Sequence, residues 1–162
     1  MNGKMVLMIT GKEVKPLIEI SISQTILELK QKIEDLTGVQ VFRQTLDFDR
    51  RIMSNDKTVS YYFGNEVYPE DPPMPIALTV QPLEGQPRFN ILVRFNDGMI
   101  GFVVRETTLV ADLKRMIEEC THILSKYVKL RRLDKEMEDQ FPLSEYYICV
   151  LSHVEMTLNF DS

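Results

Sequence analysis

Apolar and polar residues alternate in the same way near the start of the chain and again 84 residues later. The alternation predicts two strands in each copy. These strands cover residues 5–9 and 18–20 in the first copy and residues 89–93 and 102–104 in the second. Three apolar residues spaced by three and then four follow in each copy and predict one face of a helix. They are Ile26, Leu29 and Ile33, repeated as Val110, Leu113 and Ile117. Because one register survives a change of period from 2 to 3.6, the chain contains an internal repeat.

The repeat predicts two domains and the boundary between them. Each copy ends in a last strand, residues 76–80 and 154–158, and these strands align at a shift of 78. The first copy therefore carries six extra residues, within a stretch that holds four prolines and is expected to form an exposed loop. We predict domain 1 over residues 1–81 with a proline-rich insertion at about 65–75, a linker over 82–87, and domain 2 over 88–162.

The ends of both helices have recognisable signals. Thr25 and Glu28 form a capping box, and Gly38 can close the first helix in the left-handed conformation. In the second copy we expect the N-cap to move to Thr108, and His122 takes the place of Gly38. The predicted fold class is α+β, with an order of hairpin, helix, strand, turn segment and strand in each copy.

Four stretches make the chain resemble ubiquitin. In the first copy they are QTILELKQKIEDLTGV at 24–39, RQTLDF at 43–48 and KTVSYY at 57–62, and in the second copy PLSEYYI at 142–148. The last two resemble the segment of ubiquitin whose tyrosine pins a loop. The resemblance implies two tandem ubiquitin-like β-grasp domains, each a mixed sheet packed on one helix, with the repeated apolar residues as their cores.

The resemblance also defines what the chain lacks. Conjugatable relatives of ubiquitin end in an arm with two glycines, because an activating enzyme must form a thioester with an unhindered carboxylate. This sequence ends in Asn159, Phe160, Asp161 and Ser162 and contains no Gly-Gly pair. We therefore expect it to be non-conjugatable and to form no thioester with an activating enzyme.

Ubiquitin presents an apolar patch on its sheet, centred on an isoleucine, and this patch is altered here. Asp47 takes the central position in the first copy and Arg131 takes it in the second. The flanking positions are Ala77 and Thr79 in the first copy, and Glu155 and Thr157 in the second. Because an unpaired charge is costly to bury against an apolar helix, we expect ordinary ubiquitin readers not to bind.

Two further segments are candidate binding surfaces. Lys129, Arg131 and Arg132 predict a basic strip that could accept an acidic or extended peptide beside the sheet, as small ubiquitin-like modifiers accept a strand. The alternative is a solvated face balanced by nearby acidic residues. Asp47 and Arg131 could also face each other across domains or chains. The insertion could display Tyr68 and Met74, or it could simply be tolerated at a domain edge.

Candidate reactive residues are few. Cys120, His122, Cys149 and His153 do not have the spacing of a zinc site, and no third group orients a Cys–His nucleophile, so we expect no catalytic residue, metal or cofactor. Lys30, Lys32 and Lys114 match helix lysines at which ubiquitin chains are linked. We expect them here to be solvated helix residues.

Composition narrows the class of protein. Hydrophobic residues make up 44% and charged residues 27%, the balance of a soluble globular chain. The net charge of −5 is shared between the halves and argues against nucleic-acid binding. We expect no secretory signal and no membrane helix. Two cysteines suit a reducing compartment, so the expected location is cytoplasmic, nuclear or both.

The function we predict is protein–protein interaction. The leading hypothesis is a monomeric, non-catalytic adaptor that presents two ubiquitin-like surfaces to other proteins, including the ubiquitin–proteasome machinery. The alternative is a divergent ubiquitin-like modifier that acts as a protein tag after processing. A small enzyme or metal protein is the third class, and zinc in the purified material would reveal it.

Overall fold

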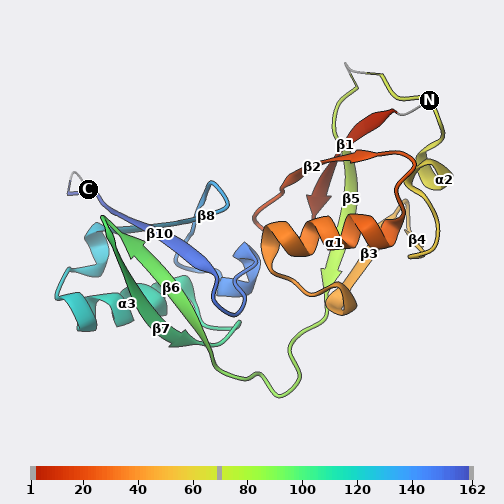
Figure 1. Ribbon diagram of the computed structural model, residues 1–162. Helices are drawn as coiled ribbons and strands as arrows, with labels where there is room; N and C mark the ends of the chain where they lie inside the picture. The colour runs from red at the N-terminus through yellow and green to blue at the C-terminus, as the bar shows by residue number, and fades with distance from the viewer. Residues whose placement is uncertain (1–2, 69–70, 161–162) are drawn as a thin grey trace. The chain divides into compact units, whose positions relative to one another are not determined.

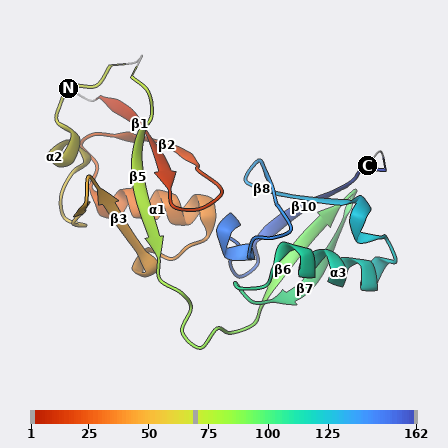
Figure 2. The same cartoon turned by 180° about the vertical axis from the view of Figure 1, so that it is seen from behind.

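The computed structural model describes residues 3–68 and 71–160, which form two compact units. Unit 1 spans Met1–Pro82 and unit 2 spans Leu83–Ser162. Each unit is a five-stranded mixed sheet with one long helix across one face (Figure 1), and Figure 2 shows the same elements from behind. The predicted α+β class, with two β-grasp units, is confirmed.

Unit 1 follows the predicted element order. Its elements are β1 (Lys4–Thr10), β2 (Leu17–Ser21), α1 (Ile26–Thr37), a 3-10 turn (Val41–Arg43), β3 (Gln44–Phe48), β4 (Arg51–Ile52), α2 (Val59–Phe63) and β5 (Met74–Val80). The strand order across the sheet is β2-β1-β5-β3-β4. The first and last strands, β1 and β5, pair in parallel at the centre, and the other pairs are antiparallel.

Unit 2 repeats this topology. Its elements are β6 (Phe89–Phe95), β7 (Gly98–Val104), α3 (Val110–Thr121), a 3-10 turn (Ser125–Tyr127), β8 (Val128–Arg132), β9 (Lys135–Glu136), a 3-10 turn (Leu143–Tyr146) and β10 (His153–Leu158). The strand order is β7-β6-β10-β8-β9, again with a parallel central pair, β6 and β10. The insertion of unit 1 lies between α2 and β5.

The core of each unit lies between its helix and its sheet. The repeated helix positions are fully buried in both copies, and so are Leu7, Ile9, Ile91 and Val93 on the central strands. Met5 is an exception to the prediction, because it stays half-buried where its counterpart Phe89 is buried.

The prediction that Lys30 and Lys114 are solvated is wrong, since each is only 8% exposed. Lys30 lies four residues after Ile26 and Lys114 four after Val110, so both fall on the stripe of the helix that faces the sheet.

The helix ends test the capping predictions. The capping box of α1 is present: the Glu28 N–H donates to Thr25 Oγ1 (3.2 Å) and the Thr25 N–H donates to Glu28 Oε1 (3.1 Å). Gly38 (φ 86°) and His122 (φ 65°) both close their helices in the left-handed conformation, as predicted. The prediction for Thr108 is wrong. The N-cap of α3 is Leu109, which caps with no side chain, and Thr108 Oγ1 accepts a hydrogen bond from the Arg105 N–H (2.9 Å) instead.

This asymmetry predicts different responses to loss of a threonine hydroxyl. Thr25→Ala should lower the free energy of unfolding of unit 1 by about 1 kcal/mol, because the first turn of α1 loses a capped N–H. Thr108→Ala should have a smaller effect on unit 2, since its hydroxyl serves no helix end. Urea unfolding of both variants measures the two effects, and equal losses would contradict the assignment of the caps.

The segment that follows unit 1 is structured against unit 2. Residues 83–86 form a turn in which the Gln86 N–H donates to the Leu83 carbonyl oxygen (3.2 Å) and Gly85 has a positive φ of 74°. The buried Glu106 holds this turn, since its Oε2 accepts from the Leu83 N–H (2.8 Å) and from Gln86 Nε2 (2.7 Å). Much of the predicted linker at 82–87 is therefore fixed to unit 2.

Candidate functional site

The predicted binding residues of unit 1 share the outer face of its sheet. Asp47 lies directly across from Ala77 on β5, and the neighbouring pair joins Thr45 to Thr79. Leu46 and Leu78, which alternate with them, are buried on the helix side. The structure therefore brings Asp47, Ala77 and Thr79 together, with a carboxylate where ubiquitin has its central isoleucine.

The predicted residues of unit 2 divide between two faces. Arg131 lies across from Glu155, and Lys129 lies across from Thr157, so these four share the outer face. The Arg131 side chain also donates through Nη2 to the Asp134 carbonyl oxygen (2.7 Å). One carboxylate, that of Glu155, therefore lies beside Arg131 on this face.

Arg132 does not belong to that face. Side chains alternate along a strand, so Arg132 lies on the side of Leu130, where its Nη2 donates to the Tyr147 carbonyl oxygen (3.3 Å) and to Ser152 Oγ (3.4 Å). Burial lowers the pKa of the Arg132 guanidinium from its ordinary value. The predicted basic strip of Lys129, Arg131 and Arg132 is therefore not continuous, and Arg132 ties the segment before β10 to β8.

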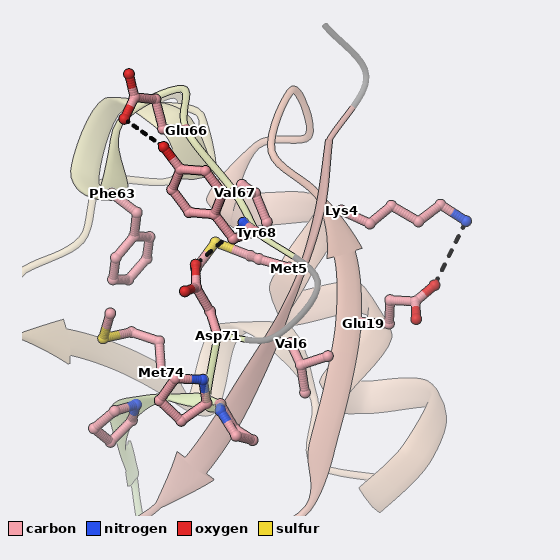
Figure 3. A pocket seen from close by; sticks show the side chains of 13 residues that line it. Lys4, Met5, Val6, Glu19, Phe63, Glu66, Val67, Tyr68, Asp71 and Met74 are labelled. Atoms are coloured by element: carbon pink, nitrogen blue, oxygen red, sulfur yellow. Dashed lines mark hydrogen bonds and ion pairs between the residues drawn. The ribbon is translucent and has the colours of Figure 1, made fainter.

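A further candidate site lies beside the proline-rich insertion of unit 1. A cavity of about 620 Å³ opens between the first strands, the end of α2 and the insertion (Figure 3). We call it the insertion cavity. Its apolar lining residues are Met5, Val6, Phe63, Val67, Tyr68, Pro72, Pro73, Met74 and Pro75. Its charged lining residues are Lys4, Glu19, Glu66 and Asp71, so three acids face one base. The lining is thus mainly apolar with an acidic excess.

Hydrogen bonds shape the wall of the insertion cavity that the insertion supplies. The Tyr68 hydroxyl donates to Glu66 Oε2 (3.1 Å), and the Tyr68 N–H donates to Asp71 Oδ2 (3.1 Å). The Asp71 N–H donates in return to the Tyr68 carbonyl oxygen (3.0 Å). These contacts hold the Tyr68 ring and two carboxylates beside the cavity, and Figure 3 shows the two that involve side chains.

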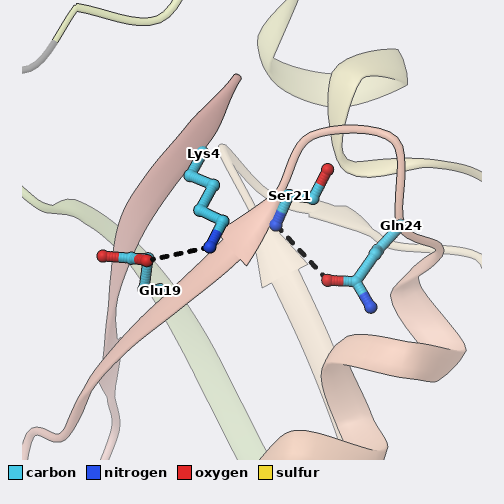
Figure 4. A network of polar contacts seen from close by, with 4 residues as sticks. All are labelled: Lys4, Glu19, Ser21 and Gln24. Atoms are coloured by element: carbon cyan, nitrogen blue, oxygen red, sulfur yellow. Dashed lines mark hydrogen bonds and ion pairs between the residues drawn. The ribbon is translucent and has the colours of Figure 1, made fainter. Parts of the chain in front are cut away.

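The β1–β2 side of the insertion cavity is held more loosely. Lys4 Nζ and Glu19 Oε1 form an ion pair at 3.6 Å (Figure 4), and their side chains are 67% and 63% exposed. Pairs this exposed contribute little stability, so either group can turn toward a ligand at little cost. Beyond them the Ser21 N–H donates to Gln24 Oε1 (3.3 Å), which joins the end of β2 to the start of α1.

Sequence reasoning found part of the insertion cavity. The insertion and its residues Tyr68 and Met74 were predicted as a candidate surface, and both line the cavity. Lys4 and Val6 were missed because β1 is distant in sequence from the insertion. Phe63, at the end of α2, was also missed, although it lies close to the insertion in sequence. A signal was present at Met5, whose counterpart in the repeat is the larger Phe89.

The cysteines and histidines belong to different elements. Cys120 is exposed on α3, and His122 is the C-cap of that helix. Cys149 is half-buried before β10, and His153 begins β10. Across residues 3–68 and 71–160, no three His, Cys, Asp or Glu side chains come together as a possible metal site. No helix in the same ranges combines the length and apolar character needed to cross a membrane.

The fold and these surfaces define a tandem β-grasp protein. Residues 6–66 match the sequence model of the ubiquitin family, which covers unit 1 up to the start of the insertion. Unit 1 is therefore a ubiquitin-family domain, and because unit 2 repeats its element order and sheet topology, the chain carries two ubiquitin-like domains. The insertion cavity is built largely from residues that lie beyond the family match.

Proposed function

We propose that this chain is a non-catalytic adaptor that binds other proteins, and that unit 1 binds a partner segment in the insertion cavity. The observation that carries the proposal is a cavity of about 620 Å³ with an apolar lining and three carboxylates against one ammonium. Such a site favours an apolar side chain flanked by lysine or arginine, because apolar burial supplies affinity and the acids supply orientation. Members of the ubiquitin–proteasome system are the first partners to test, since the fold is that of ubiquitin.

A charge placed in the insertion cavity tests the proposal. A capped peptide with one leucine between two lysines should bind the full chain, and Val6→Lys should weaken this binding by about tenfold or more by charging the apolar lining and repelling the peptide. Ala77→Lys makes the same change in charge on the outer sheet face and should alter affinity by less than about twofold. Fluorescence anisotropy of the labelled peptide measures both.

The two variants separate the two candidate surfaces. If Ala77→Lys weakens binding and Val6→Lys does not, the partner site is the outer sheet face around Asp47 and not the insertion cavity. If the peptide does not bind the wild-type chain, the cavity proposal fails. Affinity capture from a eukaryotic extract, with Asp47 and Arg131 charge-reversed forms beside these variants, then extends the comparison to natural partners.

A further inference from the structure

The two units differ in the charged partner of one buried helix lysine. Lys30 on α1 and Lys114 on α3 are equivalent in the repeat and equally buried, each with 8% of its surface exposed. Lys114 Nζ forms an ion pair with Asp139 Oδ1 at 2.6 Å. The residue equivalent to Asp139 in unit 1 is Asn55, which carries no charge. Within the described parts of the chain, the Lys30 ammonium has no hydrogen bond or ion pair.

An acid on the same helix as Lys30 already accepts a hydrogen bond. Glu34 lies one helical turn after Lys30, and its Oε2 accepts a hydrogen bond from the Val41 N–H (3.2 Å). The equivalent Glu118 of unit 2 accepts from the Ser125 N–H in the same way (2.7 Å). Because this contact is the same in both units, Glu34 does not replace the missing carboxylate. Burial lowers the pKa of Lys30, as expected for an ammonium that has lost water and gained no counter-charge.

Lys30 is reachable from outside through a shallow groove. A cavity of about 490 Å³ is lined by Lys30, Glu34, Gln40, Val41, Phe42, Gln44 and Asn55. Phe42 lies at this groove with 76% of its surface exposed. Its equivalent in unit 2 is Lys126. Unit 1 thus has an unpaired ammonium, that of Lys30, beside the exposed ring of Phe42. At the equivalent position of unit 2, the ammonium of Lys114 is paired with Asp139.

We propose that Lys30, Asn55 and Phe42 form a docking site for a glutamate or aspartate side chain of a partner protein, with an adjacent apolar residue of the partner covering Phe42. The partner carboxylate supplies the negative charge that Asp139 supplies in unit 2, and it accepts a charge-assisted hydrogen bond from the Lys30 ammonium. The Asn55 amide is neutral and does not repel this carboxylate. This site shares no lining residue with the insertion cavity, so it does not depend on the function proposed above.

The substitution Asn55→Asp provides the most direct test, because it restores the internal carboxylate found in unit 2. The probe is a capped peptide with one glutamate followed by one leucine, titrated into the isotope-labelled full chain and followed by NMR. The amide signals of Phe42 and Asn55 should shift. Asn55→Asp should weaken binding by about tenfold or more, since a tethered carboxylate outcompetes one in solution. Lys30→Met should weaken it by a similar factor.

Two controls keep the test specific. Lys32→Met removes the same charge from the same helix and should change affinity by less than about twofold. The matching peptide with glutamine for glutamate should bind about tenfold more weakly than the glutamate peptide. The proposal is overturned if the glutamate peptide leaves the wild-type signals unmoved, if glutamine binds equally well, or if Asn55→Asp retains wild-type affinity.

Discussion

Replacing Ile117 with alanine should lower the free energy of unfolding of unit 2 by about 2–5 kcal/mol and leave the unfolding of unit 1 unchanged. Ile117 lies on the face of α3 that packs against its sheet, and none of its surface is exposed. Removing most of its side chain forfeits burial and leaves a cavity that close-packed neighbours fill only in part. The effect should be local, because the helix and the sheet that enclose this core both come from unit 2.

Residue-resolved hydrogen exchange measures this effect and its location. The amides of α3 and β6 should lose protection in Ile117→Ala, while those of α1 and β1 keep it. Ile33→Ala changes the equivalent buried residue of unit 1 and should give the mirror-image result. An equal loss of protection in both units from either substitution would mean that the chain unfolds as one cooperative body.

The fold could be predicted because the same pattern of apolar residues occurs twice in the chain. Apolar spacing alone leaves short strands ambiguous, but the same spacing at a shift of 84 through strand and helix constrains the element order. The N-cap of α3 could not be found in this way. Whether Thr108 or Leu109 is the N-cap depends on the backbone angles of one residue, which the residue type determines only weakly.

The candidate sites were predicted less completely, for two different reasons. The division of Arg131 from Arg132 follows from the alternation of side chains along a strand, so the sequence contained that information. The insertion cavity could not be predicted from the sequence in this way, because its walls come from β1, β2 and α2 as well as the insertion. The difference between Asn55 and Asp139 can be read from the repeat in the sequence. The structure is needed to show that Asp139 forms an ion pair with Lys114, at 2.6 Å.

The tyrosine that pins a loop in ubiquitin has a counterpart in each unit. The Tyr146 hydroxyl accepts a hydrogen bond from the Glu138 N–H (2.8 Å), and the Tyr62 hydroxyl accepts one from the Ser54 N–H (2.7 Å). The two residues are equivalent in the repeat, and both contacts agree with the resemblance of their segments to ubiquitin. They differ in burial, since Tyr146 is 0% exposed and Tyr62 is half-buried.

Tyr146→Phe should therefore lower the free energy of unfolding of unit 2 by about 1–3 kcal/mol, because the Glu138 N–H loses an acceptor that belongs to a fully buried side chain. Tyr62→Phe should cost unit 1 less than about 1 kcal/mol, since water can replace the hydroxyl at the exposed Ser54 N–H. Urea unfolding gives the two losses, and exchange of the Glu138 and Ser54 amides assigns them to the loops. Equal losses from the two substitutions, or an unchanged Glu138 amide in Tyr146→Phe, would show that burial of the hydroxyl does not set the strength of this contact.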